Sequence, residues 1–146
     1  MPTRRRLVAL LCAAAAGCST ASSLESRPLQ SGVSRTFPAS FERISAAVDA
    51  AIETLPVNII APANVGQNRV ARFDRPVTPT GWGESGRVVI ARVDAHTTRV
   101  TVAVDPRDPA QPSARTERGY ADRIFLEVQA ALSADRRPPE GAARRS

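Results

Sequence analysis

The sequence predicts an α+β domain in which two amphipathic helices pack on one face of a four- to five-stranded antiparallel sheet, in the order β-α-β-β-β-β-α. Three observations point to this fold. Apolar residues recur at three- and four-residue spacing in two segments, as one face of a helix requires. Between those segments, short runs with strand-like composition are bounded by proline, glycine and asparagine. Helices with a single apolar stripe bury it most simply against one sheet.

The first strand and the first helix are predicted before residue 56. Residues 33–37 alternate with period two, which predicts a short strand. Ser40 is expected to cap the helix, because its side-chain oxygen can accept a hydrogen bond from a free N–H of the first turn. Pro56 ends the helix, because proline has no N–H to donate. The expected sheet-facing stripe is Phe41, Ile44, Val48 and Leu55.

Four more strands are predicted after this helix. The first is the apolar run 57–61. The second, 68–73, fits a strand less well, because Val70 and Phe73 cannot share one face without a β-bulge. The last two strands, 87–94 and 99–105, are joined by four residues and are expected to form a hairpin.

The second helix is predicted over residues 114–132. Apolar side chains lie four residues apart along it, which places them on one face. The expected sheet-facing stripe of this helix is Tyr120, Ile124, Val128 and Leu132.

Residues 1–18 have the layout of an export signal. Three arginines precede the ten-residue apolar run 7–16, and small residues lead to Cys18. Ten helical residues span about 15 Å, too short for a bilayer core of about 30 Å. The four residues 15–18 resemble the lipobox of bacterial lipoproteins, in which the cysteine is lipidated. Cleavage without lipidation is the alternative.

The chain is expected to divide into four parts. Residues 1–17 form the lipoprotein signal peptide, and residues 18–32 contain the lipidated Cys18 and a serine-rich flexible tether. Residues 33–133 form the single α+β domain. Residues 134–146 are rich in arginine and proline and are expected to be a disordered basic tail.

The charge of the chain argues against a nucleic-acid partner. The formal net charge is +6, but three of the 20 basic residues lie in the leader, so the mature chain carries +3. A balanced surface of this kind lacks the basic stripe that binds phosphates. The charge does not predict an oligomeric state.

No set of residues in the sequence points to catalysis. His96 is the only histidine and lies in the predicted hairpin turn, where a polar side chain needs no special role. Asp105 and Asp108 lie in a predicted loop, and a calcium ion would need more oxygen ligands than they supply. We therefore expect no catalytic residue, no metal and no cofactor, and we do not expect an enzyme.

Two features are expected to serve recognition. Trp82, the only tryptophan, lies between two glycines in the predicted loop 75–86. Val88 and Ile90 are expected on the sheet face opposite to the helices, where apolar residues would form an exposed patch. These three residues are the candidate partner-binding site, with Arg75 at its rim. The alternatives are that Trp82 packs over the sheet end and that the loop covers the patch.

The residues 37–44, FPASFERI, open a helix soon after the tether. This phrase resembles small lipoproteins of proteobacteria. The order of elements is similar to the helix-grip domains of the accessory lipoprotein in the outer-membrane β-barrel assembly machine. The resemblance implies a two-layer fold and a place in the cell envelope, and Ser19 after the cysteine implies sorting to the outer membrane.

Two function classes follow from these observations. The first is a periplasm-facing lipoprotein that is held in the outer membrane by Cys18 and acts as a non-enzymatic interaction module for an envelope protein. The alternative is a carrier of a small apolar ligand in a cavity between sheet and helices. Six aromatic residues are few for lining such a cavity. An enclosed apolar cavity of several hundred Å³ would favour the carrier.

Overall fold

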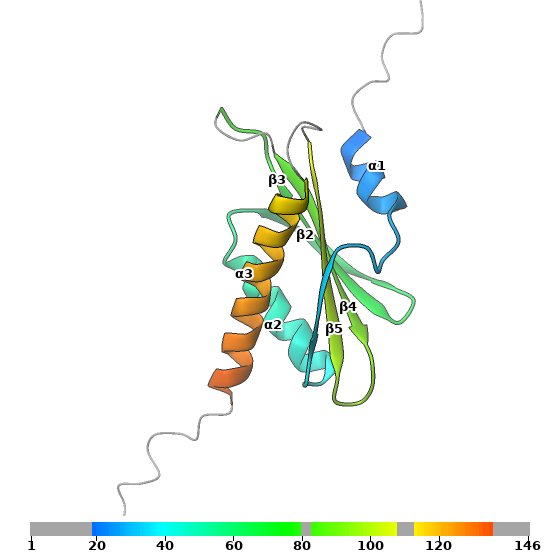
Figure 1. Ribbon diagram of the computed structural model, residues 1–146, viewed down its shortest axis with the longest axis vertical. Helices are drawn as coiled ribbons and strands as arrows, with labels where there is room; N and C mark the ends of the chain where they lie inside the picture. Colours follow the sequence, from blue (N-terminus) through cyan, green and yellow to red (C-terminus); the bar gives the residue numbers. More distant parts are fainter. Residues whose placement is uncertain (1–18, 80–82, 108–112, 136–146) are drawn as a thin grey trace, which may run out of the picture.

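A computed structural model describes residues 19–79, 83–107 and 113–135. Five antiparallel strands form one open sheet in the order β1-β5-β4-β3-β2, and two helices, α2 and α3, cover one of its faces (Figure 1). The predicted α+β fold is therefore confirmed. The elements are α1 (Ser19–Ser26), β1 (Val33–Phe37), α2 (Phe41–Glu53), β2 (Asn58–Val65), β3 (Asn68–Arg75), β4 (Glu84–Arg92), β5 (Thr98–Pro106) and α3 (Ser113–Ala134).

Helix α2 begins and packs as the sequence predicts. The Ser40 side chain accepts a hydrogen bond from the Arg43 backbone N–H, which satisfies one free donor of the first turn. Ile44 and Val48 of the predicted stripe are buried and Phe41 is half-buried, whereas Leu55 is buried but lies after the helix, which ends at Glu53. Ala47, Ala51 and Ile52 are also buried, so the apolar face of α2 is wider than the predicted stripe.

Helix α3 lies beside α2 over the same sheet face (Figure 1). Its stripe of Ile124, Val128 and Leu132 is buried, as predicted, and Tyr120 is half-buried. Phe125 widens the stripe and contacts the Phe37 ring, with 5.9 Å between ring centroids. The described part of the chain contains no helix that is long and apolar enough to cross a membrane.

Strand β3 forms without the β-bulge that the sequence suggested. Val70 and Phe73 lie on opposite faces of the sheet, and both are buried. The register shift instead lies in β2, between Ile60 and Ala63 and across Pro62. A proline cannot donate to the ladder, so it sits at an irregularity of an edge strand.

The prediction of a flexible tether over residues 18–32 is wrong for its described part. Residues 19–26 form α1, which lies against β4 and β5 on the sheet face that α2 and α3 leave open (Figure 1). Leu24 is buried in this contact. The segment is polar in composition. Hydrogen bonds and ion pairs from charged side chains of the sheet hold it in place.

Candidate interaction surfaces

The structure tests only part of the predicted binding site. Cys18 and Trp82 lie outside the described residues, so their roles stay predictions. Val88 and Ile90 are fully buried in the core beneath the helices, so their assignment to a partner surface is wrong. Val88 pairs with Val102 of β5, whose side chain belongs to the same core.

The reason for this error lies in the strand β4, which is apolar on both faces. Val89 points to the opposite face from Val88 and is also buried. A strand with two apolar faces does not show in its sequence which face the helices cover. The second face is covered because α1 lies on β4 and β5, which the sequence analysis did not foresee.

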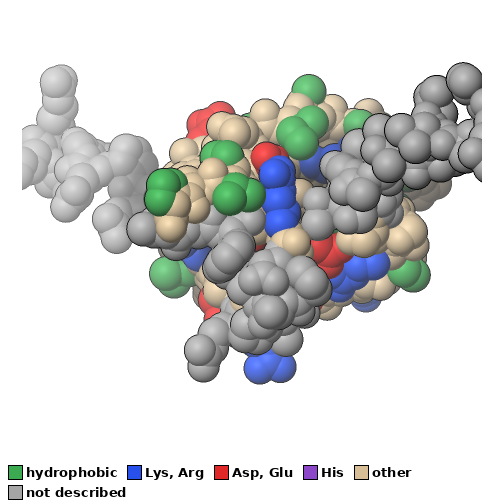
Figure 2. Space-filling view, turned by 90° about the horizontal axis from the view of Figure 1, so that it is seen from above, with side chains coloured by type: hydrophobic (Ala, Val, Ile, Leu, Met, Phe, Trp, Pro, Cys, Tyr) green, Lys and Arg blue, Asp and Glu red, His purple; other side chains and the backbone are tan. Residues whose placement is uncertain are grey.

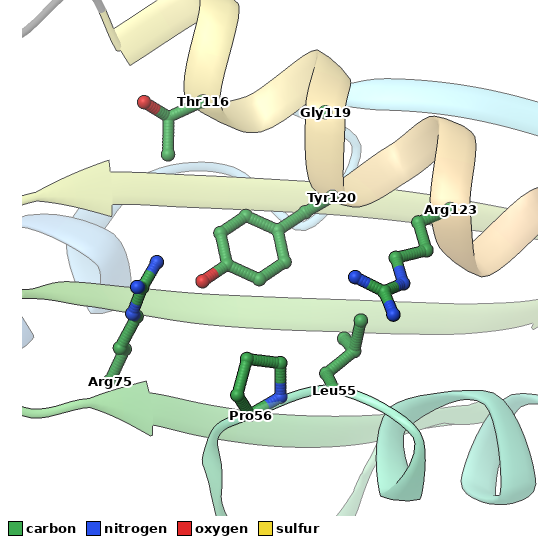
Figure 3. Close-up of a pocket in the computed structure, with 7 residues that line it drawn as sticks. All are labelled: Leu55, Pro56, Arg75, Thr116, Gly119, Tyr120 and Arg123. Carbon is green, nitrogen blue, oxygen red and sulfur yellow. The ribbon is translucent and has the colours of Figure 1, made fainter.

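Arg75, the fourth predicted site residue, lines a pocket of about 210 Å³ that opens between the helix layer and the sheet. Tyr120 occupies its centre, with the Arg75 guanidinium on one side of its ring and that of Arg123 on the other (Figure 3). Leu55 and Pro56 line the pocket below the ring. The other lining residues are Thr116 and Gly119.

A buried carboxylate lies behind this pocket. The Tyr120 hydroxyl donates a hydrogen bond of 3.2 Å to Glu84 Oε2, and Arg75 Nη1 lies 3.7 Å from the same oxygen. The Tyr120 ring also packs against the Phe73 ring, with 5.1 Å between the ring centroids. Burial raises the pKa of the Tyr120 hydroxyl, and the Glu84 carboxylate raises it further. The described residues contain no group of three or more side chains arranged to hold a metal.

Arg87 carries the contact between the sheet and the N-terminal segment. It is 2% exposed and lies near the middle of β4, on the face that α1 covers. Its Nη1 donates to the carbonyl oxygen of Leu24 at 2.8 Å, and its Nη2 donates to that of Pro28 at 2.9 Å. Both nitrogens also donate to the carbonyl of Arg27. A buried guanidinium requires such acceptors, and here they come from the end of α1 and the turn after it.

Ion pairs surround this contact. Arg27 donates to Asp105 at 2.7 Å and to Glu117 of α3 at 3.2 Å. Glu117 also accepts the backbone N–H of Val104, so one carboxylate connects α3, β5 and the N-terminal segment. Glu25 of α1 accepts a hydrogen bond of 2.7 Å from Arg72. The segment that follows α1 is therefore part of the folded domain.

The edge strand β2 is the surface that the sequence analysis missed. It pairs only with β3, and all eight of its residues are exposed. Ile59 is 48% exposed and Ile60 is 49% exposed. The signal was present in the sequence, because the strand NIIAPANV contains no charged residue, whereas exposed edge strands usually carry one.

An apolar groove runs between β2 and α2. Its volume is about 190 Å³, and it opens to the surface. Ile59 and Pro62 of β2 face Ile52 of α2 across it, and Asp49 and Glu53 lie on its rim. The remaining lining residues are Arg69, which forms an ion pair of 2.6 Å with Asp49, and Ala71.

Comparisons with known proteins leave the function open. No family model and no curated protein matches this sequence. A solved structure similar to it is the crystal structure of TTHA0849 from Thermus thermophilus, with 10% sequence identity and a TM-score of 0.38. The match covers 72% of this chain and 97% of that one. A likeness at this level carries no argument about function.

Proposed function

We propose that this protein is an outer-membrane lipoprotein that is anchored at Cys18, faces the periplasm and acts as a non-enzymatic interaction module. Its partner is an envelope protein that supplies an extended segment to the exposed edge of β2. The observation that carries this proposal is an eight-residue edge strand that is exposed throughout and carries no charge. The membrane anchor rests on the lipobox resemblance of residues 15–18.

The exposed edge of β2 can bind a partner by strand addition. An edge strand has a row of unpaired N–H and C=O groups, and a partner in extended conformation can pair with them. Pro62 interrupts the row because it has no N–H, so pairing is expected in two short runs, 58–60 and 63–65. Main-chain pairing supplies affinity without sequence specificity.

The groove beside β2 supplies the specificity. An apolar side chain of the partner would enter between Ile59 and Ile52, where it is removed from water. Two acids, Asp49 and Glu53, line the groove against one base, Arg69, so a basic residue next to the apolar one is favoured. The expected partner segment therefore alternates apolar and polar residues and contains lysine or arginine.

Photocrosslinking in cells tests this proposal. A photoreactive residue at Ile59 should crosslink to a protein partner, whereas one at Leu126 should not. Leu126 is a matched control because it is also a large apolar residue, 67% exposed, and lies on α3 away from β2. The substitution Ala63→Lys should abolish the crosslink at position 59, because a charge on an edge strand opposes strand pairing. Equal crosslinking at 59 and 126 would contradict the proposal.

The carrier of a small apolar ligand receives less support from the observations. The two pockets described above have volumes of about 210 Å³ and about 190 Å³, and both open to the surface. A site that carries a small ligand is instead a larger cavity that buries most of the ligand's surface.

A further inference from the structure

We propose that the N-terminal segment fixes one end of the domain against the bilayer, and that this end contacts the headgroup region of a zwitterionic membrane. The inference rests on the proposed lipid anchor at Cys18. It concerns the end at which α1 begins, which also carries the start of β4, the end of β5 and the connection after β3 (Figure 1).

The first step is that little free chain separates the anchor from the fold. Helix α1 begins at Ser19, the residue directly after Cys18. Leu24 is buried against the sheet, and its carbonyl oxygen accepts a hydrogen bond from the buried Arg87. Leu24 lies six positions after Cys18, with five residues between them. In the helix α1 this stretch covers about 9 Å.

The second step is that this reach selects one end of the domain. Leu24 and Arg27 lie over Arg87 and Asp105, close to where β4 begins and β5 ends. The strand β4 continues for five residues beyond Arg87, or about 17 Å, before the turn between β4 and β5 begins. The helical stretch from Leu24 back to Cys18 covers less than this distance, and α1 begins at the end of the domain opposite to that turn (Figure 1). The end that carries α1 must therefore face the membrane.

The third step is the chemistry of that end. The connection after β3 contains Pro76, Val77, Thr78 and Pro79, all exposed and none charged, and Val77 is 57% exposed. These are side chains that can enter a headgroup region at little cost.

The charges at this end are paired with one another. Arg107 lies 2.6 Å from Asp74, and Arg27 lies 2.7 Å from Asp105. Figure 2 looks down on this end and shows blue and red side chains interspersed with green ones, with no large basic patch on the visible described surface. A surface of paired charges and small apolar residues fits a zwitterionic headgroup layer, because anionic lipid would require unpaired arginines.

Depth-dependent quenching in vesicles tests the orientation. The lipidated full-length protein is reconstituted in phosphatidylcholine vesicles, with single variants Val77→Cys and His96→Cys carrying an environment-sensitive fluorophore. Lipidation blocks Cys18 and Cys12 is removed with the signal peptide, so each variant has one reactive thiol. Quencher-bearing lipids should quench the label at position 77 several-fold more than the label at position 96, which lies in the exposed turn between β4 and β5. Neither high salt nor added anionic lipid should change this ratio.

The controls separate this inference from the anchor itself. A spacer of about 15 glycine and serine residues between Cys18 and Ser19 should equalise the two positions, because such a linker reaches roughly 20 Å and more when extended. Protein that floats with the vesicles but shows equal quenching at 77 and 96 without the spacer would overturn the orientation alone. Protein that does not float would overturn the anchor, and with it the orientation. Quenching at 77 that needs anionic lipid would overturn the zwitterionic surface.

Discussion

Arg87 shows how one buried charge can determine the position of a distant segment. Its guanidinium lies on a sheet face that would otherwise be apolar, and burial lowers its pKa, although an arginine stays protonated in proteins. The carbonyl oxygens of Leu24, Arg27 and Pro28 satisfy its two terminal nitrogens. These acceptors lie about 60 residues away in the chain, so no local sequence pattern links them to Arg87.

The substitution Arg87→Ala should lower the free energy of unfolding by about 1–3 kcal/mol, because it leaves buried carbonyl oxygens without a donor. Urea unfolding of the domain measures this loss. Arg99→Ala is the control, since Arg99 is exposed on the neighbouring strand, and its effect should stay within about 0.5 kcal/mol. Equal losses for the two variants would mean that Arg87 does not hold the N-terminal segment.

Tyr120 is the only tyrosine in the chain, so its ionisation can be followed alone by ultraviolet absorbance. Burial and Glu84 raise its pKa, so the folded protein should titrate above the ordinary value of about 10 that the unfolded chain shows. Since the pKa is raised on folding, the stability contributed by the neutral hydroxyl is complete below about pH 10 and is lost as the pH rises through the folded value.

Glu84→Gln provides the control for this titration. It removes the neighbouring negative charge and should move the Tyr120 midpoint down toward the ordinary value. A folded protein whose tyrosine titrates at or below the midpoint of the urea-unfolded chain would refute the proposed environment.

At the scale of elements, α3 provides a test of the helix layer. Ile124 is fully buried, and Ile124→Ala should cost about 2–5 kcal/mol of unfolding free energy, because it removes apolar contacts and leaves a cavity. Leu126, two residues along the same helix, is 67% exposed, and Leu126→Ala should change stability by less than about 0.5 kcal/mol. Denaturant unfolding of both variants measures this contrast. Similar losses of unfolding free energy would mean that α3 does not face the sheet with Ile124.

The periodicity of apolar residues predicted α2 and α3 because each of them buries one face against the sheet. Ile124 and Val128 could be assigned to the core from spacing alone. Val88 and Ile90 could not be assigned to the correct face, because β4 is apolar on both sides and the covering element α1 is polar in composition. The helix α1 was missed for the same reason, since its order depends on Arg87 and on ion pairs that form only in the folded domain.

At the scale of the whole molecule, the two faces of the sheet have different roles. One face forms the core with α2 and α3, and the other holds the segment that leads to the predicted lipid anchor. The edge strand β2 lies at the end of the sheet order, four strands from β1, and its outer edge has no strand beside it among the described residues. The predicted anchor and the proposed partner-binding edge therefore lie on separate parts of one domain.

Hydrogen exchange of the β2 backbone tests the central claim most directly. Exchange over residues 58–65 is measured by mass spectrometry for the protein in isolated outer membranes and for the protein purified from them. The account predicts slower exchange of β2 in the membranes, because a partner strand protects N–H groups that are otherwise free, while the turn at 93–97 exchanges equally in both samples. Equal exchange of β2 in both samples would contradict the account.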